Sequence, residues 1–560
     1  MRSVLAVVVL GLVGCAGRPT EPVRAPAPQT TAAHAAEPAH EDGPSAAPKE
    51  ELAWANFSPE TFARAKAEKK FIVMDGSAEW CHWCHVMEAT TYHDANVRAV
   101  LDEHFIAVKV DIDSRPDLAE RYGDYGWPAT IMFSPDAEEI GKYRGYIAPE
   151  KFAGILKEVV ASGVATTEAG GDPGVGAQYV VGASRPAPKP FTAEHFAWIQ
   201  HDTDLDLADY WDDEQGGWGK KQKAPLGGNN AWLISKAERG NAKAKAQALF
   251  SLEKQAALID PVWGGIYQYS AAGDWEHPHF EKLMTFQAPA LDNYAEAYRV
   301  TGDARMLAHA KAMQSYIDRF MKGPAGGFYT TQDADLNAHD RTKPFMDGHR
   351  YYALSDAERT KRGIPRVDTN EYGRENGLAI AAYASMYEAT KDPATLATAT
   401  KAAEHLLATH RSKTAGGITH GPANVENADK QLFLSDNAAF GFGLARLYEV
   451  TRDDRWKKEA QAVADFLLAN LGDESGGALF GATKDPDAVG VFAKRRVPFE
   501  DNIMAVRLLA RVAKSSSDAK YGKAITRILT AMSTPEEIKA RGRWLGDYLL
   551  ALEESKSSMR

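Results

Sequence analysis

The stretch FIVMDGSAEWCHWC, residues 71–84, decides the fold of the N-terminal part of the chain. Its apolar run, Phe71 to Met74, predicts a buried strand. The residues after it predict a sharp turn, and a helix is expected to begin at Cys81. A cysteine at a helix N-terminus faces unpaired backbone N–H groups and the positive end of the helix dipole, which lower the pKa of its thiol. The stretch therefore predicts thiol chemistry at Cys81 and Cys84.

Residues 52–165 resemble thioredoxin-like proteins. The resemblance rests on Asp75 six residues before Cys81, on the run AEWC at 78–81, on the strand pattern HFIAVKVDID at 104–113, and on GWPAT at 126–130. It implies a cis-proline loop at Pro128, because a cis bond is inexpensive only before proline. It also implies that Asp75 is a buried proton acceptor for Cys84.

The two cysteines are expected to have unequal roles. Cys81 would be the exposed nucleophile that forms a mixed disulfide, and Cys84, one helical turn later, would be shielded and would resolve it. His82 would either stabilise the Cys81 thiolate as a cation or lie in solvent, and Trp127 would either line the substrate groove or simply pack. The residues predicted to bind substrate are Trp80, His82, Trp83, Trp127 and Pro128.

Three other interpretations of this segment remain. Cys81 to His85 satisfies the C-x-x-C-H pattern of haem attachment. Cys81, Cys84, His85 and His93 have the side chains of a metal site, although a second tightly spaced pair is missing. Two inert buried cysteines are a third alternative. We expect the redox pair, with no cofactor and no metal.

The first residues predict export. Arg2 precedes an apolar run, Val4 to Val13, that is too short for a stable membrane span, and LVGC at 12–15 resembles a bacterial lipobox. Residues 1–14 are thus expected to be a lipoprotein signal peptide and Cys15 the lipidated residue; an ordinary cleaved signal peptide is the alternative. The protein would then be anchored in the bacterial cell envelope, facing the periplasm.

Composition limits the remaining possibilities. Residues 15–50 are expected to be a tether, since ten alanines and seven prolines between residues 16 and 50 leave little to form a core. With Cys15 lipidated, Cys81 and Cys84 are the only cysteines left, so a structural disulfide framework is not expected. A net charge of −11 argues against nucleic acid as a partner. A length of 560 residues predicts two or more domains.

A second domain is predicted over residues 191–556, after a linker at 166–190 that is rich in glycine, alanine and proline. Amphipathic helical stretches alternate there with Gly-Gly segments at 216–217, 264–265, 326–327, 416–417 and 476–477. The helices also contain a repeated sequence pattern, which occurs at Tyr294 to Asp303, Tyr387 to Asp392 and Tyr448 to Asp453. Repeated helix pairs joined by short glycine turns predict a closed helical array.

This half resembles the six-hairpin, (α/α)6 toroid domains of several glycosidases and N-acylglucosamine 2-epimerases. The whole chain resembles the spermatogenesis-associated, thioredoxin-like family that joins the two modules. The matching segments are WCHWCHVME at 80–88, VKVDIDSRPD at 108–117, GGWG at 216–219, HPHFEK at 277–282, GGFYTTQDAD at 326–335 and FLSDNAAF at 433–440. The expected fold is an α/β thioredoxin-like domain, residues 51–165, followed by an all-α (α/α)6 toroid. The sequence departs from the family pattern at residues 283–286 and 498–502, so weak or no sugar turnover is expected.

Candidate chemistry in the toroid is expected at the mouth of its funnel. The candidate site residues are His277, His279, Glu281, Asp333, Asp335 and Asp436, with Trp218, Trp263 and Trp275 as faces for stacking a sugar. Each has a structural alternative: a helix cap for Asp436, a turn for the other aspartates, and packing against Gly-Gly turns for the tryptophans. The sequence thus predicts an exported, lipid-anchored thiol–disulfide oxidoreductase that acts on protein disulfides or a redox partner. The alternative is a carbohydrate-active or glycan-binding toroid with an accessory thioredoxin module.

Overall fold

A four-stranded mixed sheet forms the centre of the N-terminal domain, here called the head. The computed structural model describes residues 52–165, 167, 179–180, 189–340, 342–516 and 518–559. Strand β1 (Phe71–Ser77) runs parallel to β2 (Phe105–Asp111) and antiparallel to β3 (Ala129–Phe133). Strand β4 (Glu139–Arg144) pairs with β3, so the strand order is β2-β1-β3-β4.

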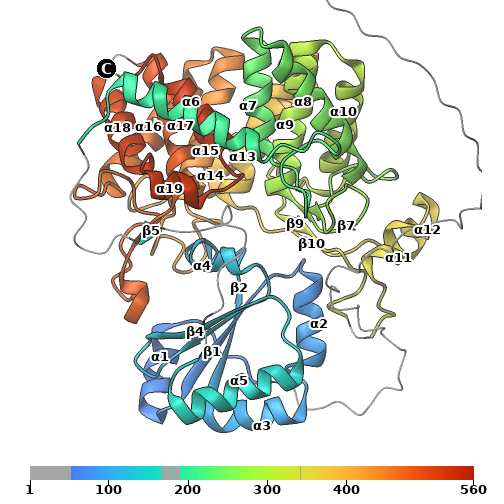
Figure 1. The fold of residues 1–560 in the computed structure, drawn as a ribbon, viewed down its shortest axis with the longest axis vertical. Coiled ribbons are helices and arrows are strands. Elements are labelled where there is room, and N and C mark those ends of the chain that lie inside the picture. The colour runs from blue at the N-terminus through green and yellow to red at the C-terminus, as the bar shows by residue number, and fades with distance from the viewer. Residues whose placement is uncertain are drawn as a thin grey trace, which may run out of the picture. The chain divides into compact units, whose positions relative to one another are not determined.

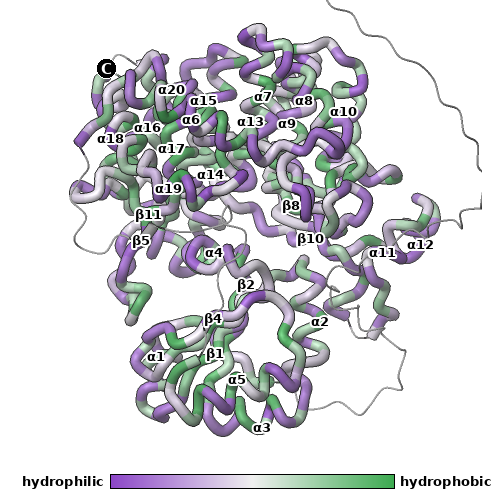
Figure 2. The backbone as a smooth tube through the Cα atoms, in the orientation of Figure 1, coloured by the Kyte–Doolittle hydropathy of each residue, from purple (hydrophilic) through white to green (hydrophobic). Residues whose placement is uncertain are grey.

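Helices cover both faces of this sheet (Figure 1). They are α1 (Pro59–Glu68), α2 (His82–Thr90), α3 (Ala95–His104), α4 (Pro116–Tyr122) and α5 (Pro149–Ser162). Successive strand residues point to opposite faces. Val73 accordingly packs with residues of α2, α3 and α5, whereas Ile72 and Met74 pack with residues of α1 and α4. Figure 2 shows the hydrophobic residues along these central strands.

Six inner helices close into a ring in the second domain, the toroid. Each packs on the next, and the last packs on the first. In ring order they are α7 (Gly227–Glu238), α9 (Met284–Thr301), α13 (Gly373–Thr390), α15 (Leu434–Thr451), α17 (Phe499–Ser515) and α20 (Gly546–Ser555). The predicted closed array is confirmed.

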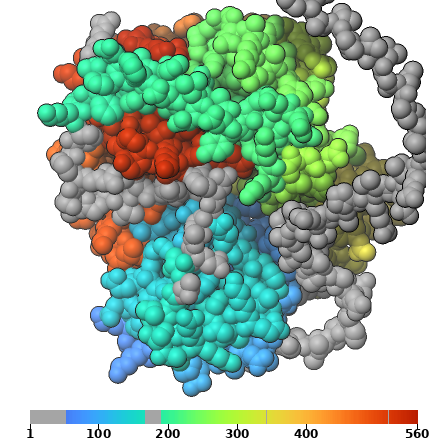
Figure 3. Space-filling model, viewed as in Figure 1, coloured from blue at the N-terminus to red at the C-terminus, as the bar shows by residue number. Residues whose placement is uncertain are grey.

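Six outer helices complete the hairpins. They are α6 (Ala193–Asp209), α8 (Ala242–Gln255), α10 (Ala304–Phe320), α14 (Pro393–Thr409), α16 (Asp454–Asn470) and α18 (Ala519–Met532). Helix α6 packs on α20, so the beginning and the end of the toroid lie side by side, as Figure 3 shows in teal and red. The connections contain α11 (Gly348–Tyr352), α12 (Asp356–Arg362), α19 (Pro535–Ala540), β5 (Tyr179–Val180), β6 (Tyr269–Ser270), β7 (Pro278–His279), β8 (Lys282–Leu283), β9 (Thr331–Gln332), β10 (Val367–Asp368) and β11 (Arg496–Val497).

Four of the five Gly-Gly turns are fixed by amide side chains from the inner helices. A backbone N–H just after the glycines donates to an asparagine or glutamine near the start of the next inner helix, at 2.7 to 2.8 Å. The pairs are Ile266 with Gln287, Phe328 with Asn376, Ile418 with Asn437 and Leu479 with Asn502. Each amide satisfies a buried N–H that would otherwise be costly to bury. The sequence repeat is therefore a repeat of hairpin closure.

The predicted signal peptide, Cys15, the tether at 15–50 and most of the linker at 166–190 lie outside the described residues. Within the described ranges, every helix is too short or too polar to cross a lipid bilayer.

Candidate functional site

Cys81 and Cys84 form a disulfide at the start of α2. Cys81 is the N-cap residue of this helix, and its Sγ accepts a hydrogen bond from the backbone N–H of Cys84 at 3.2 Å. The expected strand, turn and helix start are thus present. A sulfur at this position lies where the helix stabilises negative charge, so reduction of the bond would yield an activated thiolate.

Asp75 lies in β1, and its side chain is buried. Burial raises the pKa of the Asp75 carboxyl to about 7, an effect that the nearby positive charge of Lys109 opposes. A carboxyl that titrates near neutrality can both accept and release a proton at physiological pH. This behaviour matches the proton acceptor that the thioredoxin resemblance implies.

The Trp127–Pro128 peptide bond is cis, as the resemblance implies. The Trp127 ring lies against Gly76, where a Cβ atom would come within 2.9 Å of it. Trp127 also packs against the apolar cluster around the cysteines. Only glycine leaves room for the ring at this point of β1, so packing is one established role of Trp127.

Toroid residues cover the disulfide. Both cysteines are only 3 % exposed. They share an apolar cluster with Leu283 at the start of α9, and Phe286 of that helix packs against it. The prediction that Cys81 is exposed is therefore wrong for this structure, because the covering side chains lie about 200 residues further along the chain.

His82 pairs with the toroid. Its Nδ1 lies 2.7 Å from Oδ2 of Asp335, which is 1 % exposed. The second oxygen of Asp335 accepts the backbone N–H of Gly348 at 2.9 Å. Burial would raise the pKa of Asp335, but the hydrogen bond from His82 and the nearby His85 hold it well below its usual range. His82 thus lies neither in open solvent nor beside a free thiolate: it donates to a buried carboxylate.

His85 and His339 converge on the backbone oxygen of Glu79. The Nε2 atoms of the two imidazoles lie 3.0 Å and 2.7 Å from this oxygen. Oδ2 of Asp333 lies 3.1 Å from Nε2 of His339 and 3.9 Å from Nε2 of His85. His339 was not predicted as a site residue, because a single histidine in a loop carries no local signal.

His279 and Glu281 lie close enough to His82 for its charge to affect their pKa values. Burial, together with the charges of His82 and His349, lowers the pKa of His279 to about 4. Burial, together with the negative charge of Asp335, raises the pKa of Glu281 to about 7. With Asp333 and Asp335 these residues form one polar cluster beside α2. They are not among the residues that line the large cavity between the inner helices.

The other predicted toroid residues are dispersed. His277 is 61 % exposed and pairs with Asp274 at 2.9 Å. Asp436 is fully buried, but it does not cap its own helix: its Oδ1 accepts the N–H of Arg374 at the start of the neighbouring helix α13. The aspartate therefore links two inner helices.

The tryptophans predicted as sugar faces are buried. Trp218, Trp263 and Trp275 are 3 to 5 % exposed, and the Trp275 ring lies over Gly217. The packing alternative is therefore the right one. Trp80 was predicted to bind substrate, but it is 5 % exposed and donates from Nε1 to Asp113 at 2.7 Å. Trp83 lies against Tyr146, with 5.8 Å between ring centroids.

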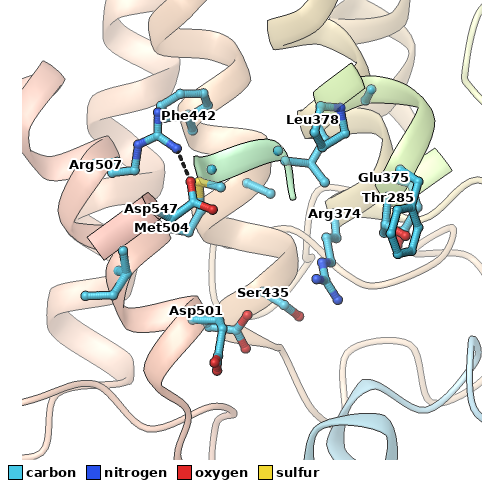
Figure 4. Close-up of a pocket in the computed structure, with 18 of the residues that line it drawn as sticks. Thr285, Arg374, Glu375, Leu378, Ser435, Phe442, Asp501, Met504, Arg507 and Asp547 are labelled. Carbon is cyan, nitrogen blue, oxygen red and sulfur yellow. Dashed lines mark hydrogen bonds and ion pairs between the residues drawn. The ribbon is translucent and has the colours of Figure 1, made fainter. Parts of the chain in front are cut away.

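A cavity of about 540 Å³ lies among the inner helices of the toroid. Residues one and two positions before the amides that fix the turns line it: Thr285, Phe286, Arg374, Glu375, Ser435, Asp436, Glu500 and Asp501. The residues that line the cavity could have been predicted from this repeated position before the amides. Figure 4 shows Arg374, Glu375 and Asp501 at the cavity and the ion pair of Arg507 with Asp547.

Residues of the head between Ile112 and Gly123 also line this cavity. His420 of the toroid lies there and contacts the head. His420 pairs through Nδ1 with Asp436 at 3.0 Å and donates from Nε2 to the backbone oxygen of Asp113 at 2.8 Å. Burial would lower the pKa of His420, but the Asp436 carboxylate raises it to about 9. Burial also raises the pKa of Asp113.

Comparisons with known proteins agree with this architecture. A model for a thioredoxin-like DsbH domain, described as a protein of unknown function, DUF255, matches residues 45–162. A second model, Glycosyl Hydrolase Family 88, matches residues 356–554. Spermatogenesis-associated protein 20 of Homo sapiens is 27 % identical over 345 residues, which are 54 % of this chain and 42 % of that protein. These matches agree with the expected resemblance to the spermatogenesis-associated, thioredoxin-like family over both modules. The chain spans about two fifths of the length of the curated relatives it matches, between 40 and 43 %.

Two further similarities concern the separate modules. The thiol:disulfide interchange protein DsbD of Ralstonia nicotianae is 31 % identical over 107 residues, which are 18 % of each chain. A solved D-mannose isomerase matches 66 % of this chain and 100 % of its own, with 11 % identity and a TM-score of 0.50. The second similarity shows the toroid fold alone.

Proposed function

We propose that this protein is a thiol–disulfide oxidoreductase that works through Cys81 and Cys84. The observation that carries the proposal is the disulfide at the N-terminus of α2. Two features support it: the buried Asp75, whose pKa lies near 7, and the similarity to a thiol:disulfide interchange protein. A disulfide that only stabilises the fold would need neither feature. A purely structural role is also weak because closing so short a loop contributes little stability.

The reaction transfers two electrons from the reduced pair to a client disulfide. The Cys81 thiolate attacks one client sulfur, the client S–S bond breaks, and the client thiolate that leaves takes up a proton. Asp75 then accepts the proton of Cys84, whose thiolate attacks the Sγ of Cys81. This attack releases the second client thiol and forms the Cys81–Cys84 disulfide. With a dithiol client the same steps run in reverse.

Access to the pair requires movement of the covering residues. A protein client has to reach cysteines that are only 3 % exposed and that pack against Leu283 and Phe286. We assign to the toroid the role of a scaffold that controls this access.

The proposal is tested by trapping the mixed disulfide. The full chain is prepared with Cys84→Ser, with Cys81→Ser and with both changes, and each is offered a protein client that contains disulfides. Cys84→Ser should accumulate adducts on non-reducing gels that disappear on reduction, whereas Cys81→Ser and the double variant should not. Adducts through Cys84 in Cys81→Ser would reverse the roles. The absence of adducts in every variant, with no disulfide turnover by the wild type, would refute the activity.

The second candidate function is carbohydrate binding or turnover in the toroid, which the cavity lined by Glu375, Asp436 and Asp501 supports. Paired carboxylates are the groups that glycoside hydrolysis uses. Sugar turnover that is lost in Asp501→Asn and kept in Asp335→Asn would favour this candidate, since Asp335 lies in the cluster beside α2.

The proposed location is the cell envelope, through a lipid on Cys15. Its support is the sequence alone: the apolar run from Val4 to Val13 and the LVGC motif.

A further inference from the structure

Four potential ligand atoms converge beside the disulfide, at a point where head and toroid meet. They are the backbone oxygen of Glu79 and Nε2 of His85 from the head, and Oδ2 of Asp333 and Nε2 of His339 from the toroid. The Glu79 oxygen lies 2.7 Å from Nε2 of His339 and 3.0 Å from Nε2 of His85, and Oδ2 of Asp333 lies 3.1 Å and 3.9 Å from the same two nitrogens. The three side-chain donors all lie within 4.8 Å of one another.

These separations fit a tetrahedral metal ion. Zinc binds imidazole nitrogen and carboxylate oxygen at about 2.0 to 2.2 Å, so neighbouring ligands in a tetrahedron lie roughly 3.3 to 3.5 Å apart. The four measured distances bracket this value from both sides. The two imidazoles and the carboxylate, which lie within 4.8 Å of one another, would draw together around such an ion.

The surroundings also fit the outer shell of such a site. Nδ1 of His85 lies 3.7 Å from Oδ2 of Asp335, in the position from which a carboxylate orients a metal-bound imidazole. The other oxygen of Asp333 accepts the backbone N–H of Asp335 at 2.9 Å, which fixes the carboxylate plane. Within the described part of the chain, the buried Nδ1 of His85 makes no hydrogen bond, so it is available to donate to Asp335 once Nε2 binds metal.

We propose that Glu79, His85, Asp333 and His339 bind a divalent cation, with Zn²⁺ the best match to two imidazoles, a carboxylate and a carbonyl. The ligands come equally from the two domains, so the ion fastens the toroid to the helix that carries the cysteines. The site uses no thiolate, because both cysteines are engaged in the disulfide. This distinguishes it from the Cys81, Cys84, His85 and His93 set considered from the sequence.

Zinc titration of the untagged full chain tests this site. The protein is kept oxidised, stripped with a chelator, and titrated with Zn²⁺ by calorimetry and with Co²⁺ by visible absorption, which reports tetrahedral coordination. We expect one ion per chain. His339→Gln and Asp333→Asn should each weaken binding at least tenfold, as loss of even an outer-shell partner costs about 10- to 100-fold. His339 is 30 % exposed, so this variant should fold.

Two controls make the outcome decisive. His277→Gln removes a histidine that is 61 % exposed and should leave zinc binding unchanged. Cys81→Ser combined with Cys84→Ser should also keep the ion. Loss of zinc in the cysteine variant would assign the ion to the thiols and overturn the proposal. Unchanged binding in His339→Gln, or no stoichiometric binding by the wild type, would equally overturn it and leave a hydrogen-bond network only.

Discussion

Asp335 of the toroid accepts a hydrogen bond from His82, the first residue of the cysteine helix, with 2.7 Å between Oδ2 and Nδ1. The two residues are 253 positions apart in the chain. This pair ties the redox segment to the second domain through a carboxylate that is 1 % exposed.

Asp335→Asn should lower the free energy of unfolding by about 3 kcal/mol, because breaking a buried pair leaves its partner without compensation. The matched control is Asp274→Asn, which breaks the exposed pair with His277 and should cost about 1 kcal/mol or less. Urea denaturation of the two variants measures the difference. Equal losses would show that the His82 pair contributes no more than a surface contact.

Leu283→Ala should speed alkylation of Cys81 in the reduced protein by about tenfold or more, because removing about 2 kcal/mol of packing makes the uncovered state more populated. The rate is read by mass spectrometry after timed alkylation. The control is Leu396→Ala on α14, a partly buried position outside the cluster around the cysteines. A similar acceleration in both variants would mean that general loosening, and not the cover, governs access.

Asp75→Asn should stabilise the protein above neutral pH. The folded state holds the Asp75 proton with a pKa of about 7, against 3.8 in the unfolded chain. Stability should therefore be highest below pH 3.8, fall between about pH 4 and 7, and level off above, a loss of about 4 kcal/mol from this group. The variant should escape this loss, so that its unfolding free energy exceeds that of the wild type at pH 8 and the difference disappears toward pH 4.

The control for this effect is Asp136→Asn, an exposed carboxylate that pairs with Lys66. Its pH profile should follow that of the wild type. An Asp75→Asn protein that is less stable than the wild type at pH 8 would contradict a burial penalty on the charged form.

His420→Gln should destabilise the protein most at acidic to neutral pH. The pKa of His420 is about 9 in the folded state, against 6.5 for the free side chain. Its stabilising contribution, about 3 kcal/mol, is fully present below pH 6.5 and is lost as the pH rises through 9. Thermal melts from pH 6 to 10 measure it, with the exposed His201→Gln as control. A penalty that does not change with pH would indicate a purely steric role.

Cys15→Ser should release the protein from the membrane fraction, or leave it unprocessed, without altering the redox activity of the head. Fractionation of cells that make each form, together with gel migration, measures this outcome. A variant that fractionates and migrates like the wild type would refute lipidation at this residue.

Local sequence signals were sufficient for the head and for the ring. Strand β1, the turn and the start of α2 depend on neighbouring residues, so the run from Phe71 to Cys84 predicts them. The ring follows from the repeated Gly-Gly segments, since four of the five turns are closed by an amide on the next inner helix.

The surroundings of the cysteines could not be predicted in the same way. Leu283 and Asp335 approach Cys81 and His82 only because two domains pack together, and neither residue carries a periodic signal for that contact. For this reason the exposure of Cys81 was predicted wrongly, and the pairing of Asp335 with His82 was not predicted. The cavity lining at Glu375 and Asp501 was missed, although it occupies a repeated position before the turn-fixing amides.

Closure of the ring by α20 on α7 has a consequence for the order of assembly. The ribosome completes the head before it makes any toroid helix, and N-terminal domains generally fold first during synthesis. The toroid cannot close until residues 546–555 have emerged. Throughout that interval Leu283 and Phe286 have no finished ring to hold them over the cysteines. Until the ring closes, the cysteines of a folded head therefore lack the cover that the complete toroid provides.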